Sequence, residues 1–433
     1  MTTELIVLLA SQEVGRVCRD RRGRLTFVYN AEWRTASGAY PLSLSMPLAA
    51  EEHGPGPVQA FLWGLLPDNE HVLERWAKKF HVSARNVFAL LSHVGEDCAG
   101  AVQFVPPDRL DAIRSGEQEQ IEWLDQHGIA ERLKALRDDH AAWRLPSDTG
   151  QFSLAGAQPK TALLLENDRW GIPTGRVPTT HILKPPTGQF NGHAENEHIC
   201  LAVARAFGLP AALSNVMRFE NEIAIVVERY DRLSRGNEVI RVHQEDMCQA
   251  LGIMPTQKYQ NEGGPSAIDI VALLRSQSSD RETDVDTFLR ATGFNWLVAG
   301  SDAHAKNHSL LIGSGPRVRL APLYDIASVL PYDNIALQKV KLAMKIGGEY
   351  RLRQIGPRQW QKFAAEMRVD ADGFIDSLGA MAKQLPDEVA LACHDAHEEG
   401  LDSPLIDRLR ETLTERSNEC LRMLDGRIDS QAE

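Results

Sequence analysis

The residues best suited to chemistry lie in the stretch "SDAHAKNHS" (301–309), which carries an aspartate, a lysine, an asparagine and two histidines. Asp302 and Asn307 are five positions apart. Phosphoryl-transfer sites use this spacing for an aspartate that accepts the substrate hydroxyl proton and an asparagine that holds magnesium. Lys306 is placed to neutralise charge on the transferring group. The spacing alone leaves a second interpretation open, an Asp-Asn turn before a strand with both histidines on the surface.

A second carboxylate and an upstream lysine fit the same chemistry. Asp325 follows the apolar approach "LAPLYDIAS", and magnesium favours carboxylate, amide and phosphate oxygens. Lys184 ends the predicted strand "THILK", where phosphoryl transfer needs a lysine for the nucleotide phosphates. Taken alone, a strand lysine is usually a solvated edge residue. The order of Lys184, Asp302 and Asp325 along the chain favours the chemical interpretation.

Two further segments are candidates for nucleotide contacts. The loop "SLAGAQPK" (153–160) has small residues around Gly156 that would let backbone amides approach phosphates, although by its pattern alone a plain hairpin turn is the preferred interpretation. The stretch "VVERYDR" (226–232) ends a predicted strand whose backbone could meet an adenine, with Tyr230 over the base. An ordinary strand terminus is the alternative.

The segment "RVHQEDMCQALG" (241–252) is predicted to begin an amphipathic helix. Met247 and Cys248 would face the core, while Gln244 and Asp246 would contact a nucleotide or cap the helix. A different pair, His394 and His397, is three positions apart and could ligate a metal on a helix. No third ligand lies at a suitable spacing and HExxH is absent, so an exposed helix face is the preferred interpretation.

Composition excludes several classes of protein. The chain has 433 residues, 43% hydrophobic and 24% charged, as in a cytoplasmic globular protein of two or three domains. The formal charge of −12 argues against a dominant basic face for nucleic acid, although DNA contact through a partner stays open. Six widely spaced cysteines indicate reduced thiols. The first apolar run lacks a basic flank before Arg16, and no run reaches membrane-spanning length, so we expect neither a signal peptide nor a membrane span.

The hydrophobic pattern predicts an α+β fold, because short antiparallel strands precede a mostly helical region. We expect four segments: an N-terminal unit of strands and helices over 1–110, a charged helical connector with little buried surface over 111–147, a small β-rich lobe over 148–232, and a helical lobe over 233–433. The last segment contains the polar stretch described first.

In their order along the chain, these motifs resemble the HipA-type serine/threonine kinase toxins of bacterial toxin–antitoxin modules. The resemblance covers nearly the whole chain and rests on "PLSLSMPL", "LLPDN", "SLAGAQPKTALL", "TTHILK", "ENEHICLAVARAFGL", "VVERYDR", "HQEDMCQALG", "SDAHAKNHS" and "LAPLYDIAS". It implies a bilobal protein-kinase-like fold with an additional N-terminal β-rich subdomain.

The resemblance also implies a role for each matching residue, with ATP and Mg²⁺ as cofactors. Asp302 matches the catalytic base, supported by Lys306, and the magnesium ligands match Asn307 and Asp325. Ser153 matches a serine whose autophosphorylation ejects the phosphate loop and switches the kinase off. The expected nucleotide-binding residues are Ser153, Ala155, Gly156, Ala157, Gln158, Lys160, Lys184, Glu228, Tyr230, Gln244 and His304. Pro159 stands where an acidic residue is expected, and it removes one backbone N–H from the loop.

The family implies partners as well. Its members phosphorylate glutamyl-tRNA synthetase, which halts translation and leads to growth arrest and persistence. A small helix-turn-helix antitoxin of the HipB type neutralises them and binds operator DNA, so this acidic chain would meet DNA mainly through that partner. Two alternatives remain: a chain that acts chiefly as a corepressor, and a metal-dependent phosphohydrolase that uses His243, Asp302, His304 and Asp325.

Overall fold

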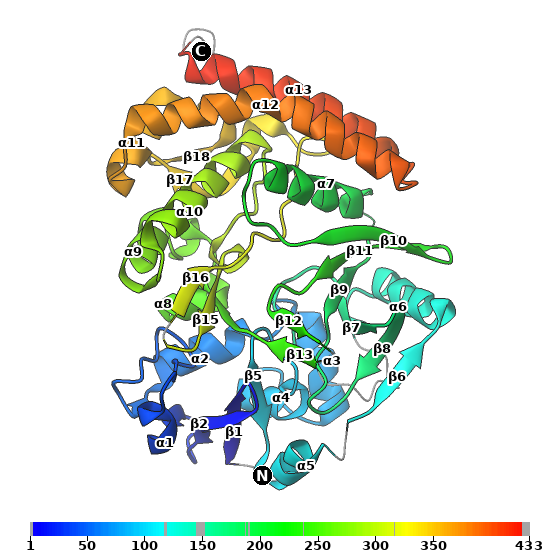
Figure 1. Cartoon of the computed structure of the whole chain (residues 1–433), viewed down its shortest axis with the longest axis vertical. Helices are drawn as coiled ribbons and strands as arrows, with labels where there is room; N and C mark the ends of the chain where they lie inside the picture. Colours follow the sequence, from blue (N-terminus) through cyan, green and yellow to red (C-terminus); the bar gives the residue numbers. More distant parts are fainter. Residues whose placement is uncertain are drawn as a thin grey trace. The chain divides into compact units, whose positions relative to one another are not determined.

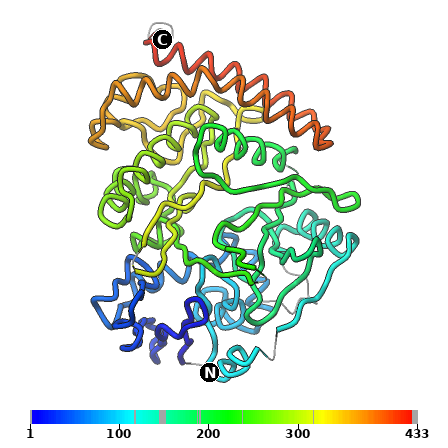
Figure 2. Tube along the Cα trace, viewed as in Figure 1, coloured from blue at the N-terminus to red at the C-terminus, as the bar shows by residue number. Residues whose placement is uncertain are grey.

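The computed structural model describes residues 3–116, 119–143, 152–186, 188, 191–236, 238–315 and 317–426. The chain divides into two compact units, each built from segments distant in sequence, as the trace in Figure 2 shows. Unit 1 comprises Met1–Pro185, Met217–Gln257 and Ser309–Ala321. Unit 2 comprises Pro186–Val216, Lys258–His308 and Pro322–Glu433. The units differ from the predicted division at 110, 147 and 232, because the chain returns to unit 1 twice after leaving it.

Unit 1 begins with an antiparallel sheet in the order β4-β3-β2-β1-β5. The strands predicted in the first fifty residues are therefore confirmed. Leu5, Val7 and Leu9 on β1, an interior strand between β2 and β5, are completely buried, and helices α2 and α4 pack on the sheet. The elements are β1 (Glu4–Leu9), β2 (Gln12–Arg19), β3 (Leu25–Tyr29), β4 (Glu52–His53), β5 (Val102–Val105), α1 (Ala31–Thr35), α2 (Pro55–Gly64), α3 (Glu70–Phe80), α4 (Val87–Val94) and α5 (Leu110–Ser115).

A second antiparallel sheet has the order β10-β11-β9-β7-β8-β6 (Figure 1). Asn167 and Asp168 both have positive φ, as the tight turn between β7 and β8 requires, so the predicted Asn-Asp hairpin is confirmed. The elements are β6 (Ile121–Leu124), α6 (Gln126–Asp138), β7 (Thr161–Glu166), β8 (Arg169–Pro173), β9 (His181–Lys184), β10 (Ser214–Phe219) and β11 (Glu222–Glu228).

The expectation of a helical connector with little buried surface over 111–147 is wrong for its described residues. The segment supplies the edge strand β6 and helix α6. Ile129 and Leu133 on α6 are buried in one core with Trp170 and Leu183 of the sheet. The many charged residues of the segment obscured this apolar stripe, whose members follow the helical spacing.

Unit 1 also contains the hairpin of β12 (Arg232–Arg235) and β13 (Glu238–Arg241), and the sheet β14-β15-β16. This sheet joins β14 (His243–Asp246) to β15 (Ser309–Gly313) and β16 (Arg317–Leu320). The helix predicted to begin near 241 starts only at Met247, as α8 (Met247–Leu251). Asp246 caps it through a capping box with Gln249, so the residues before the cap are free to form a strand.

Unit 2 is mostly helical, and α12 and α13 run side by side in it (Figure 1). Trp296 and Trp360 meet edge to face in its core, with ring centroids 5.4 Å apart. Ser403 occupies the N-cap of α13 and Pro404 its first turn, as predicted. The elements are α7 (His193–Ala206), α9 (Ala267–Gln277), α10 (Arg281–Leu297), β17 (Lys341–Ile346), β18 (Glu349–Arg351), α11 (Pro357–Met367), α12 (Ala371–Glu398) and α13 (Pro404–Leu424).

The structure also bears on the cysteines, on the expectation of no membrane-spanning helix and on the pair His394 and His397. All six cysteines are free thiols. Across the part of the chain that the structure describes, no helix combines the length and apolar character needed to cross a membrane. His394 and His397 both lie exposed on α12, where the Nδ1 of His397 contacts the Leu401 carbonyl, so an ordinary helix face is confirmed.

Candidate active site

The candidate catalytic loop follows directly after α10 in unit 2. Ala299 has a φ of 54°, and the Gly300 N–H donates to the Asn295 carbonyl at 2.8 Å, so the chain turns sharply out of the helix. A Cβ added at Gly300 would lie 2.4 Å from Asn295 Oδ1, which explains why glycine occupies this position. After this turn Asp302 lies exposed, while the residues from 304 to 310 are buried.

Asp302 accepts hydrogen bonds from one residue of the loop, Asn307, and from one residue outside it, Tyr259. Asn307 Nδ2 donates to the Asp302 carbonyl at 2.8 Å, which identifies Oδ1 as the end of that amide available to a cation. Tyr259 Oη donates to Asp302 Oδ1 at 2.6 Å. The Tyr259 ring also meets His304 edge to face, with centroids 5.0 Å apart. Sequence reasoning missed Tyr259, because nothing in its local pattern marks it.

The candidate second magnesium ligand lies on a segment tied to the same loop. Leu323 exchanges backbone hydrogen bonds with Pro210 and Ala212, both 2.8 Å long. The next residue, Tyr324, donates its hydroxyl to the Lys306 carbonyl at 2.7 Å. Asp325 itself has a φ of 59°, a left-handed conformation that non-glycine residues seldom adopt and that is typical of functional sites.

Asn307 and Asp325 line one small pocket, whose wall consists of Asn295, Ala303, Asn307, His308, Leu323, Tyr324, Asp325 and Ile326. One amide oxygen and one carboxylate suit magnesium, which keeps waters and takes its remaining ligands from phosphates. Within the described ranges no three or more His, Cys, Asp or Glu side chains gather as a metal cage. The residues present therefore fit a magnesium ion bound together with a nucleotide.

The histidines of this loop are buried, so the interpretation of a simple surface turn is wrong. His304 is 4% exposed and His308 is 5% exposed. His308 packs edge to face on Phe288, and burial lowers its pKa to about 4, which keeps it neutral. The phosphohydrolase alternative also loses its first ligand, because the Nε2 of His243 contacts the Leu42 carbonyl at 2.8 Å in the core of unit 1.

The candidate phosphate loop (153–160) lies in unit 1. Ser153 is completely buried, its Oγ donating to the Leu65 carbonyl at 2.8 Å. Gly156 has a φ of 103°, which favours glycine. Lys160 Nζ donates to the Ala155 carbonyl at 2.8 Å and lies 5.3 Å from the centroid of the Trp143 ring. Of the other predicted residues, Ala157 is exposed and Gln158 half-buried. The loop leads directly into β7, and at its start Phe152 forms an isolated parallel bridge with Asp97.

The remaining predicted nucleotide residues also lie in unit 1. Lys184 is the last residue of β9 and is 7% exposed. Glu228, exposed, ends the neighbouring strand β11. Tyr230 follows and donates its hydroxyl to Gln244 Oε1. Gln244 Nε2 in turn donates to Asp231 Oδ2 at 2.9 Å, so the structure brings Tyr230 and Gln244 into direct contact. Asp231 was not singled out from the sequence.

Comparison with known proteins places this geometry in a family. A model of the HipA N-terminal domain matches residues 5–105, and one of the HipA-like C-terminal domain matches residues 152–390. The Y4mE protein of Sinorhizobium fredii is 37% identical over 412 residues, covering 93% of this chain and 95% of that protein. The serine/threonine-protein kinase toxin HipA of Shewanella oneidensis is 28% identical over 377 residues, covering 84% and 82% respectively.

A solved structure agrees. A chain in the complex of HipA, HipB and operator DNA from Shewanella oneidensis superposes with a TM-score of 0.83 at 25% identity, covering 99% of this chain and all of that one. The expected α+β, kinase-like fold with an added N-terminal β-rich part is therefore confirmed. With both of its domains matched in order, the chain belongs to the HipA family of kinase toxins.

Proposed function

We propose that this chain is an ATP-dependent serine/threonine protein kinase and the toxin of a toxin–antitoxin module. The observation that carries the proposal is the pocket in unit 2, where Asn307 and Asp325 lie together on segments tied to Asp302. Phosphoryl transfer needs a carboxylate at the attacking hydroxyl and magnesium ligands for the phosphates. This pocket and its loop provide both.

In this proposal Asp302 orients the substrate hydroxyl and accepts its proton. The hydrogen bond from Tyr259 to Oδ1 stabilises the carboxylate and leaves Oδ2 for the substrate. Asn307 and Asp325 would hold magnesium, which when bound neutralises charge on the phosphates. Lys306, its backbone fixed by Tyr324, supports the charge balance of the loop.

The residues of unit 1 would bind the nucleotide. Lys184 would contact the α- and β-phosphates, and the backbone of the phosphate loop would cover them. Glu228 and Tyr230 would contact the adenine. Because the Gln244 amide is fixed between Tyr230 and Asp231, it presents a defined face to the nucleotide.

We propose that autophosphorylation of Ser153 switches the kinase off. The Ser153 hydroxyl is buried against the Leu65 carbonyl, so the loop has to leave this position before the serine can accept a phosphoryl group. A phosphoserine dianion could not return beside that carbonyl, because a buried charge without a partner is costly. The modified loop would therefore stay away from ATP. Mass spectrometry of the Ser153 peptide, before and after incubation with ATP, tests this step.

The partners are proposed from the relatives. The matched complex contains HipB and operator DNA, which supports a HipB-type antitoxin as partner and DNA contact mainly through it. The formal charge of −12 agrees with an indirect contact. We propose glutamyl-tRNA synthetase as the protein substrate and the cytoplasm as the location, since that enzyme acts there.

The kinase assignment is tested by transfer of radiolabelled phosphate from ATP to glutamyl-tRNA synthetase. Asp302→Ala should abolish transfer and leave the unfolding temperature and antitoxin binding unchanged. Asp286→Ala removes a carboxylate that is 66% exposed on α10 and should retain full activity. Undiminished transfer by the Asp302 variant would disprove the assignment. Transfer to other proteins but not to the synthetase would change only the substrate.

The corepressor alternative makes a different prediction. If the chain acts mainly by assembling on operator DNA, growth arrest on overexpression should survive Asp302→Ala. If it acts as a kinase, the arrest should disappear with that substitution while repression by the antitoxin complex continues.

A further inference from the structure

A buried ionic cluster in unit 1 links three segments that lie far apart in the sequence. Asp97 Oδ1 accepts from Arg232 at 2.9 Å and from Arg241 at 3.2 Å. Asp97 Oδ2 accepts from Thr179 Oγ1 at 2.6 Å and from Arg229 at 3.4 Å. With Asp231, the cluster contains two aspartates and three arginines, all within 7% side-chain exposure.

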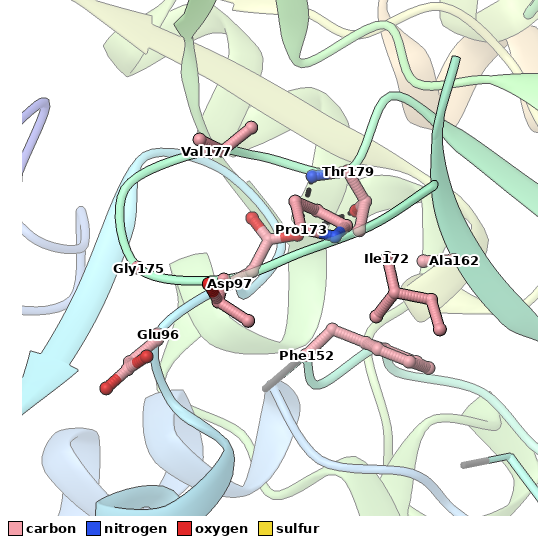
Figure 3. A pocket seen from close by; sticks show the side chains of 10 residues that line it. Glu96, Asp97, Phe152, Ala162, Ile172, Pro173, Gly175, Val177 and Thr179 are labelled. Atoms are coloured by element: carbon pink, nitrogen blue, oxygen red, sulfur yellow. Dashed lines mark hydrogen bonds between the residues drawn. The ribbon is translucent and has the colours of Figure 1, made fainter. Parts of the chain in front are cut away.

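The cluster touches the phosphate loop directly. The Asp97 carbonyl accepts from the Ser153 N–H at 2.9 Å, and Asp97 and Phe152 form a parallel bridge. Figure 3 shows Asp97 and Phe152 on the wall of one pocket, with Asp97 hydrogen-bonded to Thr179. The N-terminal domain makes further loop contacts through the Leu65 carbonyl, and through the Asp68 N–H, which donates to the Gly156 carbonyl at 3.0 Å.

The other side of the cluster reaches the adenine-contacting segment (226–232). Asp231 Oδ2 accepts from the Gly100 N–H at 2.6 Å and from Gln244 Nε2 at 2.9 Å. The Cys98 carbonyl accepts from Arg229 at 2.9 Å and from Arg232 at 3.0 Å. The short segment 96–101 of the N-terminal domain therefore holds the phosphate loop through a backbone bond and the adenine segment through its charges.

The charges make this connection rigid. Burial alone would raise the pKa of Asp97, but Arg232, Arg229 and Arg241 lower it to about 2, so it stays ionised. A buried ion whose partner is removed is strongly destabilised, so separating these aspartates from their arginines would be costly. Movement of segment 96–101 would accordingly displace both nucleotide-binding elements at once.

We infer that the N-terminal domain is part of the nucleotide-binding machinery, with Asp97 as the positioning residue that sets the phosphate loop and the adenine segment relative to each other. The nucleotide in this inference rests on the proposed function. The expected effect of Asp97 on the order of the phosphate loop does not depend on that function.

The test uses the full chain and a charge-neutral pair of substitutions. Asp97→Asn with Arg241→Gln leaves the net charge of the cluster at its present value, because one charge of each sign is lost. The matched control is Asp333→Asn with Arg408→Gln, which removes an ion pair on unit 2 with side chains 80% and 42% exposed. Thr179→Val is a milder second variant, since it removes one hydroxyl that donates to Asp97.

Two readouts separate positioning from mere support of the fold. Without nucleotide, amide exchange at Ser153 should be about tenfold faster in the double variant and in Thr179→Val than in the wild type and the control. With Mg·ATP, the Kd should rise about fivefold or more while kcat at saturating ATP changes less than twofold.

Lower thermal stability with unchanged Ser153 exchange and unchanged Kd would overturn the inference. If the wild type binds no Mg·ATP, the proposed function fails, and faster Ser153 exchange in the variants would still support the positioning role. If the double variant does not fold, the Ser153 exchange rate and the Kd of Thr179→Val decide whether the inference holds.

Discussion

Glu245 provides the sharpest prediction about stability. It lies on β14 and is 1% exposed, and its Oε1 accepts from the Leu44 N–H at 2.8 Å. The other oxygen, Oε2, has no hydrogen-bond partner among the described residues. Glu245→Gln keeps the acceptor toward Leu44 and puts a neutral group at the other position. The variant therefore resembles the protonated wild type at every pH.

The expected magnitude follows from the pKa of this carboxyl. Burial raises the pKa of Glu245 from 4.5 to about 8. Between these values the folded chain holds a proton that the unfolded chain has released, so the free energy of unfolding falls as pH rises. At about 1.36 kcal/mol per pH unit, the loss between pH 4.5 and pH 8 reaches at most about 5 kcal/mol. Glu245→Gln should escape this loss.

The assay is denaturant unfolding of both proteins, followed by tryptophan fluorescence from pH 5 to pH 9. Burial also lowers the pKa of His243 and of His308 to about 4, which makes the folded state less stable as pH falls below 6.5. That effect is common to both proteins and cancels in their difference. The free energy of unfolding of the variant should rise steadily relative to that of the wild type up to about pH 8. A constant difference over the whole range would refute the reasoning.

Three further substitutions test the candidate site. Gly156→Ala places a side chain at a φ of 103° and within 2.6 Å of Lys160 Nζ. The resulting strain of about 1–3 kcal/mol should weaken ATP binding in a calorimetric titration. Unchanged affinity would show that the loop relaxes. Tyr259→Phe should lower kcat about tenfold and leave the KM for ATP within twofold, because one charge-assisted hydrogen bond to Asp302 is lost; an unchanged kcat would remove Tyr259 from the mechanism. Asp325→Asn should raise the magnesium concentration needed for half-maximal activity at least about tenfold, whereas an unchanged requirement would exclude Asp325 as a ligand.

Features encoded within a few residues were predicted well. The spacing of Asp302 and Asn307 identified a loop that the Asn307 side chain closes on the Asp302 carbonyl. The Asn-Asp dipeptide at 167–168 predicted a hairpin, and Ser403 with Pro404 predicted a helix start. In each case the local pattern and the tertiary structure favour the same conformation.

Long-range pairings were not predictable from one sequence. Tyr259 and Asp302 are 43 positions apart, and Asp97 and Arg229 are 132 apart, so no periodicity or motif connects either pair. The segment before Met247 was misread for a related reason. Its pairing with β15, some sixty residues further on, makes it a strand although its local pattern is helical.

The candidate catalytic loop of unit 2 and the candidate phosphate loop of unit 1 differ in where their geometry is specified. The candidate catalytic loop is closed in part by its own Asn307, so its local spacing already pointed to its chemistry. The phosphate loop has one glycine and a proline, and by pattern it is a hairpin turn. Its observed shape comes from Leu65, Asp68 and Asp97, none of which belongs to the loop. Substitutions that displace segment 96–101, such as Asp97→Asn with Arg241→Gln, should therefore change nucleotide affinity more than substitutions at exposed loop positions such as Ala157, because the first shift the backbone groups that hydrogen-bond the loop and the second do not.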